Sequence, residues 1–353
     1  MDKSKILKLL KPGRIIYPIA IGLLVAGFLL FKDFNKDTFS NINWTWHSGV
    51  WCLAALMMVA LRDLAYIYRI RILTDKELTW KKGFQVIMLW EFASAVTPSA
   101  VGGSPVAIFI IHREKINIGK STAIVMVTSL LDELFYVIMV PLVYFTVGSE
   151  RIFSIAEMSS LAEMTFGYGL FSVFIIGYFI IFTYCLIILY ALFYKPRVIK
   201  WLFIKVFSLP LLRKWRKDAA KAGDDLIIAS KEIKGKPRAY WVKAGAATFF
   251  SWTARFWVVN FLILIPLVSG LGMYEHLLIY ARQLVMWVIL LISPTPGGSG
   301  VAEVIFSVFL GDFIPNGLNS AMALLWRLMS YYPYLIIGAI ILPGWLKRVY
   351  TKE

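Results

Sequence analysis

Eight hydrophobic stretches constrain the fold of this chain more than any other feature of its sequence. Six of them hold 17 residues or more with few charges, enough for a helix to cross a hydrocarbon layer of roughly 30 Å. These predicted spans are 15–31, 45–67, 121–146, 167–194, 241–267 and 319–343. Only 16% of the residues are charged, against about 25% in a soluble domain, which leaves too little polar surface to cover the apolar chain. The sequence therefore predicts an all-α polytopic membrane protein with a single transmembrane domain over residues 1–353.

The net charge of +16 is distributed in a way that indicates a topology and not a nucleic-acid partner. Of the 37 Lys and Arg residues, 29 lie in segments that one topology puts on the same side of the membrane. These segments are 1–14, 68–82, 112–120, 195–240 and 344–353. Because basic residues gather in cytoplasmic loops, we expect a multi-pass protein of the cytoplasmic (inner) membrane with both termini cytoplasmic.

Two further hydrophobic regions, 83–111 and 277–310, are interrupted by proline and glycine. The flanks of the first region are basic, whereas the segments that flank the second carry no Lys or Arg. If both regions crossed the membrane completely, the basic loop at 195–240 would move to the outside, against the distribution of charge. We therefore predict two re-entrant helical hairpins that enter the membrane from opposite faces.

The order of elements repeats within the chain. Two predicted spans, a hairpin and a third span follow one another in residues 15–146, and the same order recurs in residues 167–343. The two halves start from opposite sides of the membrane. The two tips share Thr-Pro and Gly-Gly-Ser words, and the Gly-Gly pairs are 195 residues apart. Inverted repeats whose broken helices meet near the middle of the membrane are typical of transporters. The sequence predicts such an inverted-topology repeat; chance recurrence of small-residue words is the alternative.

The predicted tips hold most of the candidate binding residues. Glycine permits a tight turn and a close backbone approach, and a helix that restarts beyond it directs free N–H groups and the positive end of its dipole into the site. A phosphate or a carboxylate fits such an end. The candidates are Thr97, Gly102, Gly103 and Ser104 in the first tip, and Thr295, Gly297, Gly298 and Ser299 in the second. We expect helices to restart at Ser104 and Ser299; the alternative is that the hairpins only plug the bundle.

Ionisable residues inside membrane segments usually face the protein interior, because exposure to lipid is costly. The further candidate substrate-binding residues are Glu91, Asp132, Arg255, Glu303 and Arg327. Asp132 and Arg327 take equivalent places in the two halves at the offset of 195. A structural ion pair between these two residues is the alternative to a role in the site.

The remaining polar residues indicate no further site in the membrane. Arg62 and Asp63 are expected near the end of a span, where their side chains reach the interface. Cys52 and Cys185 lie in apolar stretches, and the three histidines have no metal-ligand spacing. With no catalytic or nucleotide-binding motif either, we predict a protein that is not an enzyme and uses neither metal nor cofactor. The loop at 195–240 mixes apolar and basic residues, which favours amphipathic helices on an anionic leaflet or a plain topology determinant.

The words TPSAVGGSP at 97–105 and PTPGGSGVAE at 294–303 resemble the lysylphosphatidylglycerol synthase transmembrane-region family, also called the flippase-like domain. Members of that family often carry an acidic residue near the first tip, where this chain has Ser104 and Ile108. The resemblance implies lipid handling, because members fused to an aminoacyltransferase move aminoacylated phosphatidylglycerol between leaflets. This chain ends at Glu353 without such a domain and is expected to be a stand-alone translocator.

We therefore expect a flippase or scramblase for an anionic or aminoacylated phospholipid, or for a polyprenyl-phosphate lipid. In this hypothesis Ser104 and Ser299 hold the phosphate, Arg255 or Arg327 adds positive charge, and Glu303 orients a cationic or hydroxyl group. The first alternative is an ion-coupled transporter of a small soluble anion. The second is a membrane scaffold whose basic loop recruits partners.

Overall fold

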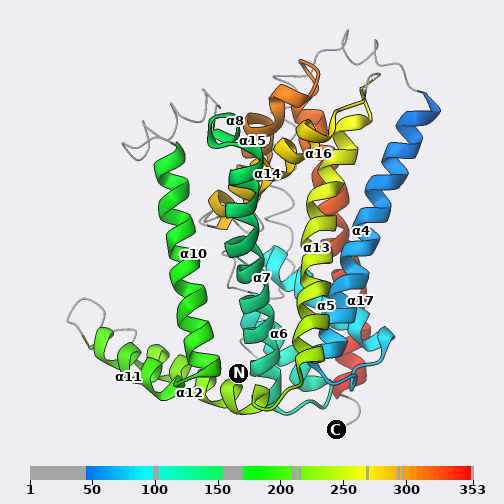
Figure 1. Cartoon of the computed structure of the whole chain (residues 1–353). Helices are drawn as coiled ribbons and strands as arrows, with labels where there is room; N and C mark the ends of the chain where they lie inside the picture. Colours follow the sequence, from blue (N-terminus) through cyan, green and yellow to red (C-terminus); the bar gives the residue numbers. More distant parts are fainter. Residues whose placement is uncertain are drawn as a thin grey trace.

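The computed structural model describes residues 45–97, 103–153, 170–208, 213, 216–267, 270–291, 295 and 298–350, and the predicted first span at 15–31 lies outside them. The described elements are α4 (Trp46–Leu73), α5 (Trp80–Val96), α6 (Gly103–Arg113), α7 (Ile118–Val147), α8 (Ser149–Phe153), α10 (Leu170–Phe193), α11 (Pro196–Val206), α12 (Arg216–Ile233), α13 (Arg238–Leu264), α14 (Met273–Leu291), α15 (Val301–Leu310), the 3₁₀ turn η3 (Gly311–Phe313), α16 (Asn319–Ser330) and α17 (Tyr332–Tyr350). Most of them stand side by side in a helical bundle (Figure 1).

Among the residues that the structure describes, five helical segments are long and apolar enough to cross a membrane, and each matches one of the predicted spans. The last segment, Asn319–Tyr350, is divided at Tyr331 into α16 and α17. Pro333 explains the division, because it has no N–H to donate and its ring crowds the turn before it. The all-α polytopic membrane architecture is therefore confirmed.

One helix is longer than its sequence predicted. The span predicted to end at residue 67 continues as α4 to Leu73, where the hydroxyl of Thr74 bonds the carbonyl of Ile70. The hydropathy of the sequence falls at Arg69 and Arg71, but Arg69 is only 4% exposed. A cation with a partner inside the protein does not end a helix, which is why hydropathy placed the boundary about two turns too early.

The two interrupted regions form helical hairpins in opposite halves of the bundle. The arms α5 and α6 pack together in the lower half of Figure 1, and α14 and α15 pack together in the upper half. The shorter arms hold 11 and 10 residues, or about 15–17 Å at 1.5 Å per residue, too short to cross a hydrocarbon layer. Re-entry from opposite faces is the arrangement that these lengths and positions support.

Helix contacts are reciprocal between the two halves of the chain. Helix α4 lies along α13 over most of its length, and the arm α5 packs on α17 as the arm α14 packs on α7. The second arms follow the same rule, since α6 contacts α7 and α15 contacts α16. Such pairs are what a two-fold relation between residues 15–146 and 167–343 would produce. The repeat itself stays a prediction, because its first span lies outside the described residues.

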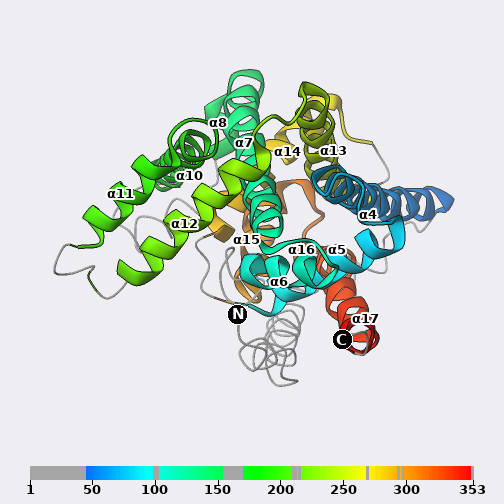
Figure 2. The same cartoon turned by 90° about the horizontal axis from the view of Figure 1, so that it is seen from below.

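The basic stretch 195–240 contributes two helices at the foot of α10. Helices α11 and α12 pack against each other, joined by an ion pair of 2.5 Å between Lys200 and Asp224. They lie across the end of the bundle and reach out beyond it (Figures 1 and 2). The loops 74–79 and 114–117 lie at this same end, which we call the basic end of the bundle.

The basic and opposite ends should be accessible from different sides of the membrane. Single cysteines replacing Lys115, in the loop between α6 and α7, and Asn316, between η3 and α16, would both be exposed. In a background with Cys52 and Cys185 changed to serine, we expect a membrane-impermeant maleimide to label only position 316 from outside intact cells. Labelling of both positions from the same side would contradict the opposed hairpins.

A buried carboxylate ties the first hairpin to the last helix. Glu114 accepts hydrogen bonds from Trp345 Nε1 at 2.8 Å and from Arg348, and it lies 3.3 Å from Lys82 Nζ. Burial alone would raise the pKa of Glu114, but the bonds from Arg348 and Trp345 outweigh it and lower the pKa. We expect Glu114→Gln to lower the free energy of unfolding by about 2 kcal/mol at neutral pH.

The pH dependence of this loss follows from the lowered pKa of Glu114. Its stabilising effect is complete above the unfolded pKa of about 4.3 and disappears as the pH falls through the lower pKa of the folded state. Thermal unfolding of the detergent-solubilised protein should therefore separate wild type from Glu114→Gln at pH 7 and bring them together in strong acid. An equal gap at both pH values would count against the assignment.

Candidate functional site

A cavity of about 330 Å³ lies inside the bundle, between the two hairpins. Its walls come from α4, α5, α7, α13, α14, α16 and α17, and from residues at both tips. Three cationic side chains, Arg69, Arg255 and Arg327, line it together with two acidic ones, Glu91 and Asp132. The charged side chains that line this cavity thus carry a net charge of +1.

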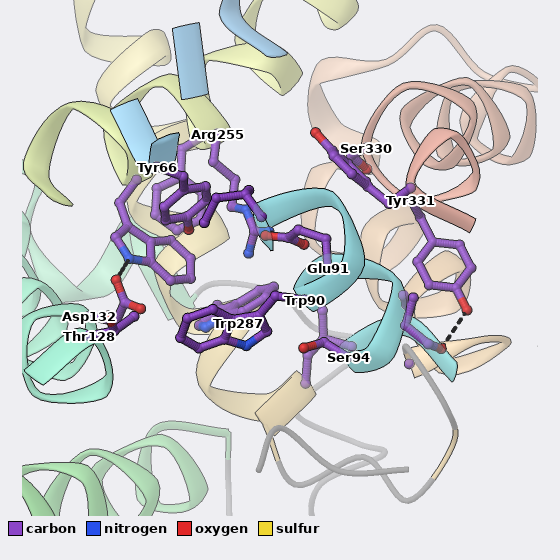
Figure 3. A pocket seen from close by; sticks show the side chains of 18 of the residues that line it. Tyr66, Trp90, Glu91, Ser94, Thr128, Asp132, Arg255, Trp287, Ser330 and Tyr331 are labelled. Carbon is purple, nitrogen blue, oxygen red and sulfur yellow. Dashed lines mark hydrogen bonds and ion pairs between the residues drawn. The ribbon is translucent and has the colours of Figure 1, made fainter. Parts of the chain in front are cut away.

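Arg255 of α13 is the most exposed of the three cations that line the cavity. Its guanidinium lies 4.8 Å from the ring centre of Trp252 and 4.9 Å from that of Trp287, and both contacts are cation–π interactions. Its ion contact is with Glu91 at 3.9 Å, and the two side chains point toward each other in Figure 3. Within the part of the chain that the structure describes, Arg255 makes no hydrogen bond, and its side chain is 20% exposed. Its N–H donors are therefore available to a ligand.

Arg62 of α4 neutralises Glu91 from the other side. It is 2% exposed, its Nη2 donates to Glu91 at 2.6 Å, and its guanidinium stacks on Tyr334 at 4.7 Å. Tyr334 in turn donates its hydroxyl to Asp63 at 2.9 Å. The expectation that Arg62 reaches for the interface is therefore wrong, because partners inside the bundle satisfy its charge.

Asp132 of α7 is held by two donors on other helices. Arg69 bonds it at 2.5 Å, and the indole N–H of Trp252 bonds it at 2.8 Å. Arg69 also donates to Thr248 at 3.0 Å, so this cluster joins α4, α7 and α13. Asp132 and Arg327 both line the cavity, but they do not pair with each other. Asp132 pairs with Arg69, and Arg327 pairs with Glu303.

The first tip borders the cavity at the start of α6. Ser104 lines the cavity, and α6 begins one residue earlier, at Gly103. A Cβ at Gly103 would lie 2.1 Å from Ser94 Oγ and 3.1 Å from Ser94 Cα, so only glycine allows α6 to approach α5 this closely. Thr97 is buried and bonds the carbonyl of Ala93 at 2.8 Å instead of facing the cavity. Gly102 lies outside the described residues.

The second tip joins the cavity wall to a buried ion pair. Thr295 and Gly298 line the cavity, whereas Ser299 is buried and bonds the hydroxyl of Tyr331 at 3.4 Å. Helix α15 begins at Val301, two residues later than predicted. Its cap, Gly300, has a φ of +87°, which glycine adopts without strain. Gly297 lies outside the described residues.

Glu303 does not reach the cavity. It is 0% exposed, pairs with Arg327 Nε at 3.0 Å and accepts the backbone N–H of Gly300 at 2.8 Å. Arg327 stacks on Tyr331 at 3.6 Å, and Tyr331 donates its hydroxyl to the carbonyl of Ala95 at 3.1 Å (Figure 3). Glu303 therefore positions Arg327, and Tyr331 links the end of α5 to the second tip.

The structure thus brings seven of the thirteen predicted site residues to one cavity. They are Glu91, Ser104, Asp132, Arg255, Thr295, Gly298 and Arg327. Gly103, Thr97, Ser299 and Glu303 lie in the surrounding wall. Sequence reasoning missed Arg69 and the aromatic lining. Arg69 follows Arg62 by seven residues, two turns of one helix face, and that spacing was the available signal.

The free energy of unfolding should distinguish the buried pair of Glu303 and Arg327 from Arg255. Glu303→Gln leaves Arg327 buried without its carboxylate, so we expect a loss of about 3 kcal/mol in the free energy of unfolding. Arg255→Gln removes only cation–π contacts and a long ion contact, and should cost about 1 kcal/mol. Thermal unfolding of both variants in the same detergent measures the difference. A larger loss for Arg255→Gln would show that Arg255 is structural.

Comparisons with known proteins agree with this architecture. The family described as "Lysylphosphatidylglycerol synthase TM region" matches residues 15–338. A curated relative, "UPF0104 membrane protein" from Archaeoglobus fulgidus, is 26% identical over 327 residues, which cover 90% of this chain and 85% of the relative. No solved structure matches the chain. Because the family match extends over most of the sequence, from the first predicted span into α17, this chain belongs to the lysylphosphatidylglycerol synthase transmembrane-region family.

Proposed function

We propose that this protein moves an anionic membrane lipid between the two leaflets, as a flippase or scramblase. The observation that carries the proposal is Arg255, whose N–H donors face a cavity inside an apolar bundle. A guanidinium that is stabilised by aromatic rings, and that makes no hydrogen bond to a carboxylate, can donate its N–H groups to a phosphate. The net positive lining of the cavity and the lipid in the family's name support the same conclusion.

The size of the cavity favours a headgroup over a whole lipid. A volume of about 330 Å³ is at the lower end of the range for ligand pockets, 300–1,000 Å³, and cannot also hold two acyl chains. In our proposal the phosphate meets Arg255 and the N-terminal ends of α6 and α15, while the acyl chains stay in the bilayer. Glu91 lies within 3.9 Å of Arg255, where it can accept a bond from a hydroxyl or an amino group on the headgroup.

Membrane topology and the absence of catalysis are part of the same proposal. The basic end would face the cytoplasm, in accordance with the distribution of Lys and Arg. Translocation needs no covalent chemistry, so we propose a transporter and not an enzyme. Because a cavity with charged residues in its lining, and not a fully packed interior, lies between the tips, the scaffold alternative is less well supported.

Transport in liposomes tests the proposal. Protein is reconstituted in vesicles that carry fluorescent phosphatidylglycerol, and the fraction accessible to an impermeant quencher is followed in time. We expect wild type to accelerate exchange and Arg255→Gln to slow it by 10-fold to 100-fold, the equivalent of one charge-assisted hydrogen bond. Arg238→Gln, an exposed arginine on the same helix α13, is the matched control and should keep the wild-type rate.

Two results would overturn the proposal. One is equal movement of several anionic lipids with and without protein. The other is uptake of a small soluble anion that depends on Arg255 while lipid exchange does not, which would favour the ion-coupled transporter. Arg327→Ala and Glu303→Gln are expected to lose both stability and exchange, because Glu303 positions Arg327.

A further inference from the structure

A second cavity, of about 470 Å³, lies at the basic end of the bundle where α10, α11, α12 and the start of α13 meet. It shares no lining residue with the central cavity. Its frame is fixed by the hydroxyl of Ser230 on α12, which donates to the carbonyl of Leu192 on α10 at 2.7 Å. The site proposed above makes no use of this pocket.

Four cationic side chains line the pocket. Arg197 on α11, Lys231 on α12 and Lys234 beyond it are exposed, and no described carboxylate forms an ion pair with any of them. Lys236 is committed to Asp75, at 2.7 Å. Cations drawn together without counter-charges repel each other, and an anion bound among them relieves that repulsion. The charges that line the pocket therefore favour an anionic ligand.

Aromatic and aliphatic side chains beside the pocket indicate that the anion belongs to a lipid. Phe193 and Trp241, both in the lining, have ring centres 5.1 Å apart, and Tyr194 is 77% exposed at the end of α10. Aromatic residues at the end of a span mark the level of the lipid headgroups. The pocket therefore lies where the phosphate of a phospholipid would be.

The exposed side of α11 likewise combines apolar and aromatic side chains with a cation. Four apolar residues of α11 are exposed on one face of the helix, at spacings of three and four residues: Val198, Trp201, Leu202 and Val206. Lys205 lies on the same face, over the ring of Trp201 at 4.9 Å. An amphipathic helix of this kind lies in the plane of a membrane surface.

We propose that this pocket binds the phosphate headgroup of an anionic phospholipid in the leaflet at the basic end, with the apolar face of α11 resting among the acyl chains. Arg197, Lys231 and Lys234 hold the phosphate, and Phe193 and Trp241 contact the upper part of the acyl chains. The bound lipid sets the depth of α10, α11 and α12 in the membrane. This role is separate from translocation, because none of the central cavity residues takes part.

Lipid counting by native mass spectrometry tests the pocket. All variants carry Arg255→Gln, so that binding in the central cavity is weakened equally throughout. The probes are dioctanoyl phosphatidylglycerol, dioctanoyl phosphatidylcholine and inorganic phosphate, each added to the full-length protein in detergent. Lys231→Ala with Lys234→Ala should weaken retention of phosphatidylglycerol about 30-fold, since each cation near an anionic headgroup contributes about a factor of five.

A control on the same helix accounts for the change in net charge. Lys217→Ala with Lys221→Ala removes two exposed cations of α12 that do not line the pocket, and should leave retention unchanged. Equal loss in both double variants, or equal retention of phosphatidylcholine and phosphatidylglycerol, would overturn the proposal. Competition by inorganic phosphate at the same concentration as phosphatidylglycerol would also overturn it, in favour of a soluble phosphate ligand. A failure here leaves the exchange assay for the central cavity unaffected.

Discussion

A charge inside a membrane protein is stable only where it meets an opposite charge or a set of hydrogen bonds, because the surrounding medium cannot solvate it. In this bundle that requirement is met by ion pairs that connect different helices. Arg62 joins α4 to α5 through Glu91, and Arg69 joins α4 to α7 through Asp132. The pair between Arg327 and Glu303 joins α16 to α15 in the same way. Each pair fixes one hairpin or span against the next.

Arg255 is held differently, and this difference makes the cavity a candidate binding site. Trp252 and Trp287 stabilise its charge through their ring faces, which leaves the N–H edge of the guanidinium open. A carboxylate in close contact would have occupied that edge. The aromatic lining therefore stabilises the cation while its N–H donors stay available for hydrogen bonds. The arginines paired with carboxylates at 3.0 Å or less serve mainly to hold the helices together.

The two pockets combine the same chemistry at two depths. Both place cations among aromatic side chains, one inside the bundle and one at its basic end. In our proposals the outer pocket keeps a lipid in place, whereas the inner cavity binds a headgroup only transiently. Tyr331 contacts both hairpins, through the carbonyl of Ala95 at the end of α5 and the hydroxyl of Ser299. It is therefore placed to couple any movement of one hairpin to the other.

Much of this protein could be predicted from local properties of the sequence. The length of apolar runs, the side on which basic residues gather and the breaks at proline and glycine each depend on residues close together in the chain. They sufficed for the polytopic class and the hairpins, whereas the binding role of the tip residues stays a prediction. Hydropathy failed at Arg69, since it counts a paired, buried cation as it counts an exposed one.

By itself, the sequence determined that the chain crosses the membrane repeatedly and which segments do so, because crossing depends on local hydrophobicity. It also singled out Glu303 and Arg327 as notable charges, but not their relationship. Only the tertiary structure decided that Glu303 forms an ion pair with Arg327 and that the N–H donors of Arg255 face the cavity. Partnership between charges depends on contacts between helices far apart in sequence, and no local pattern encodes which carboxylate a buried arginine will meet.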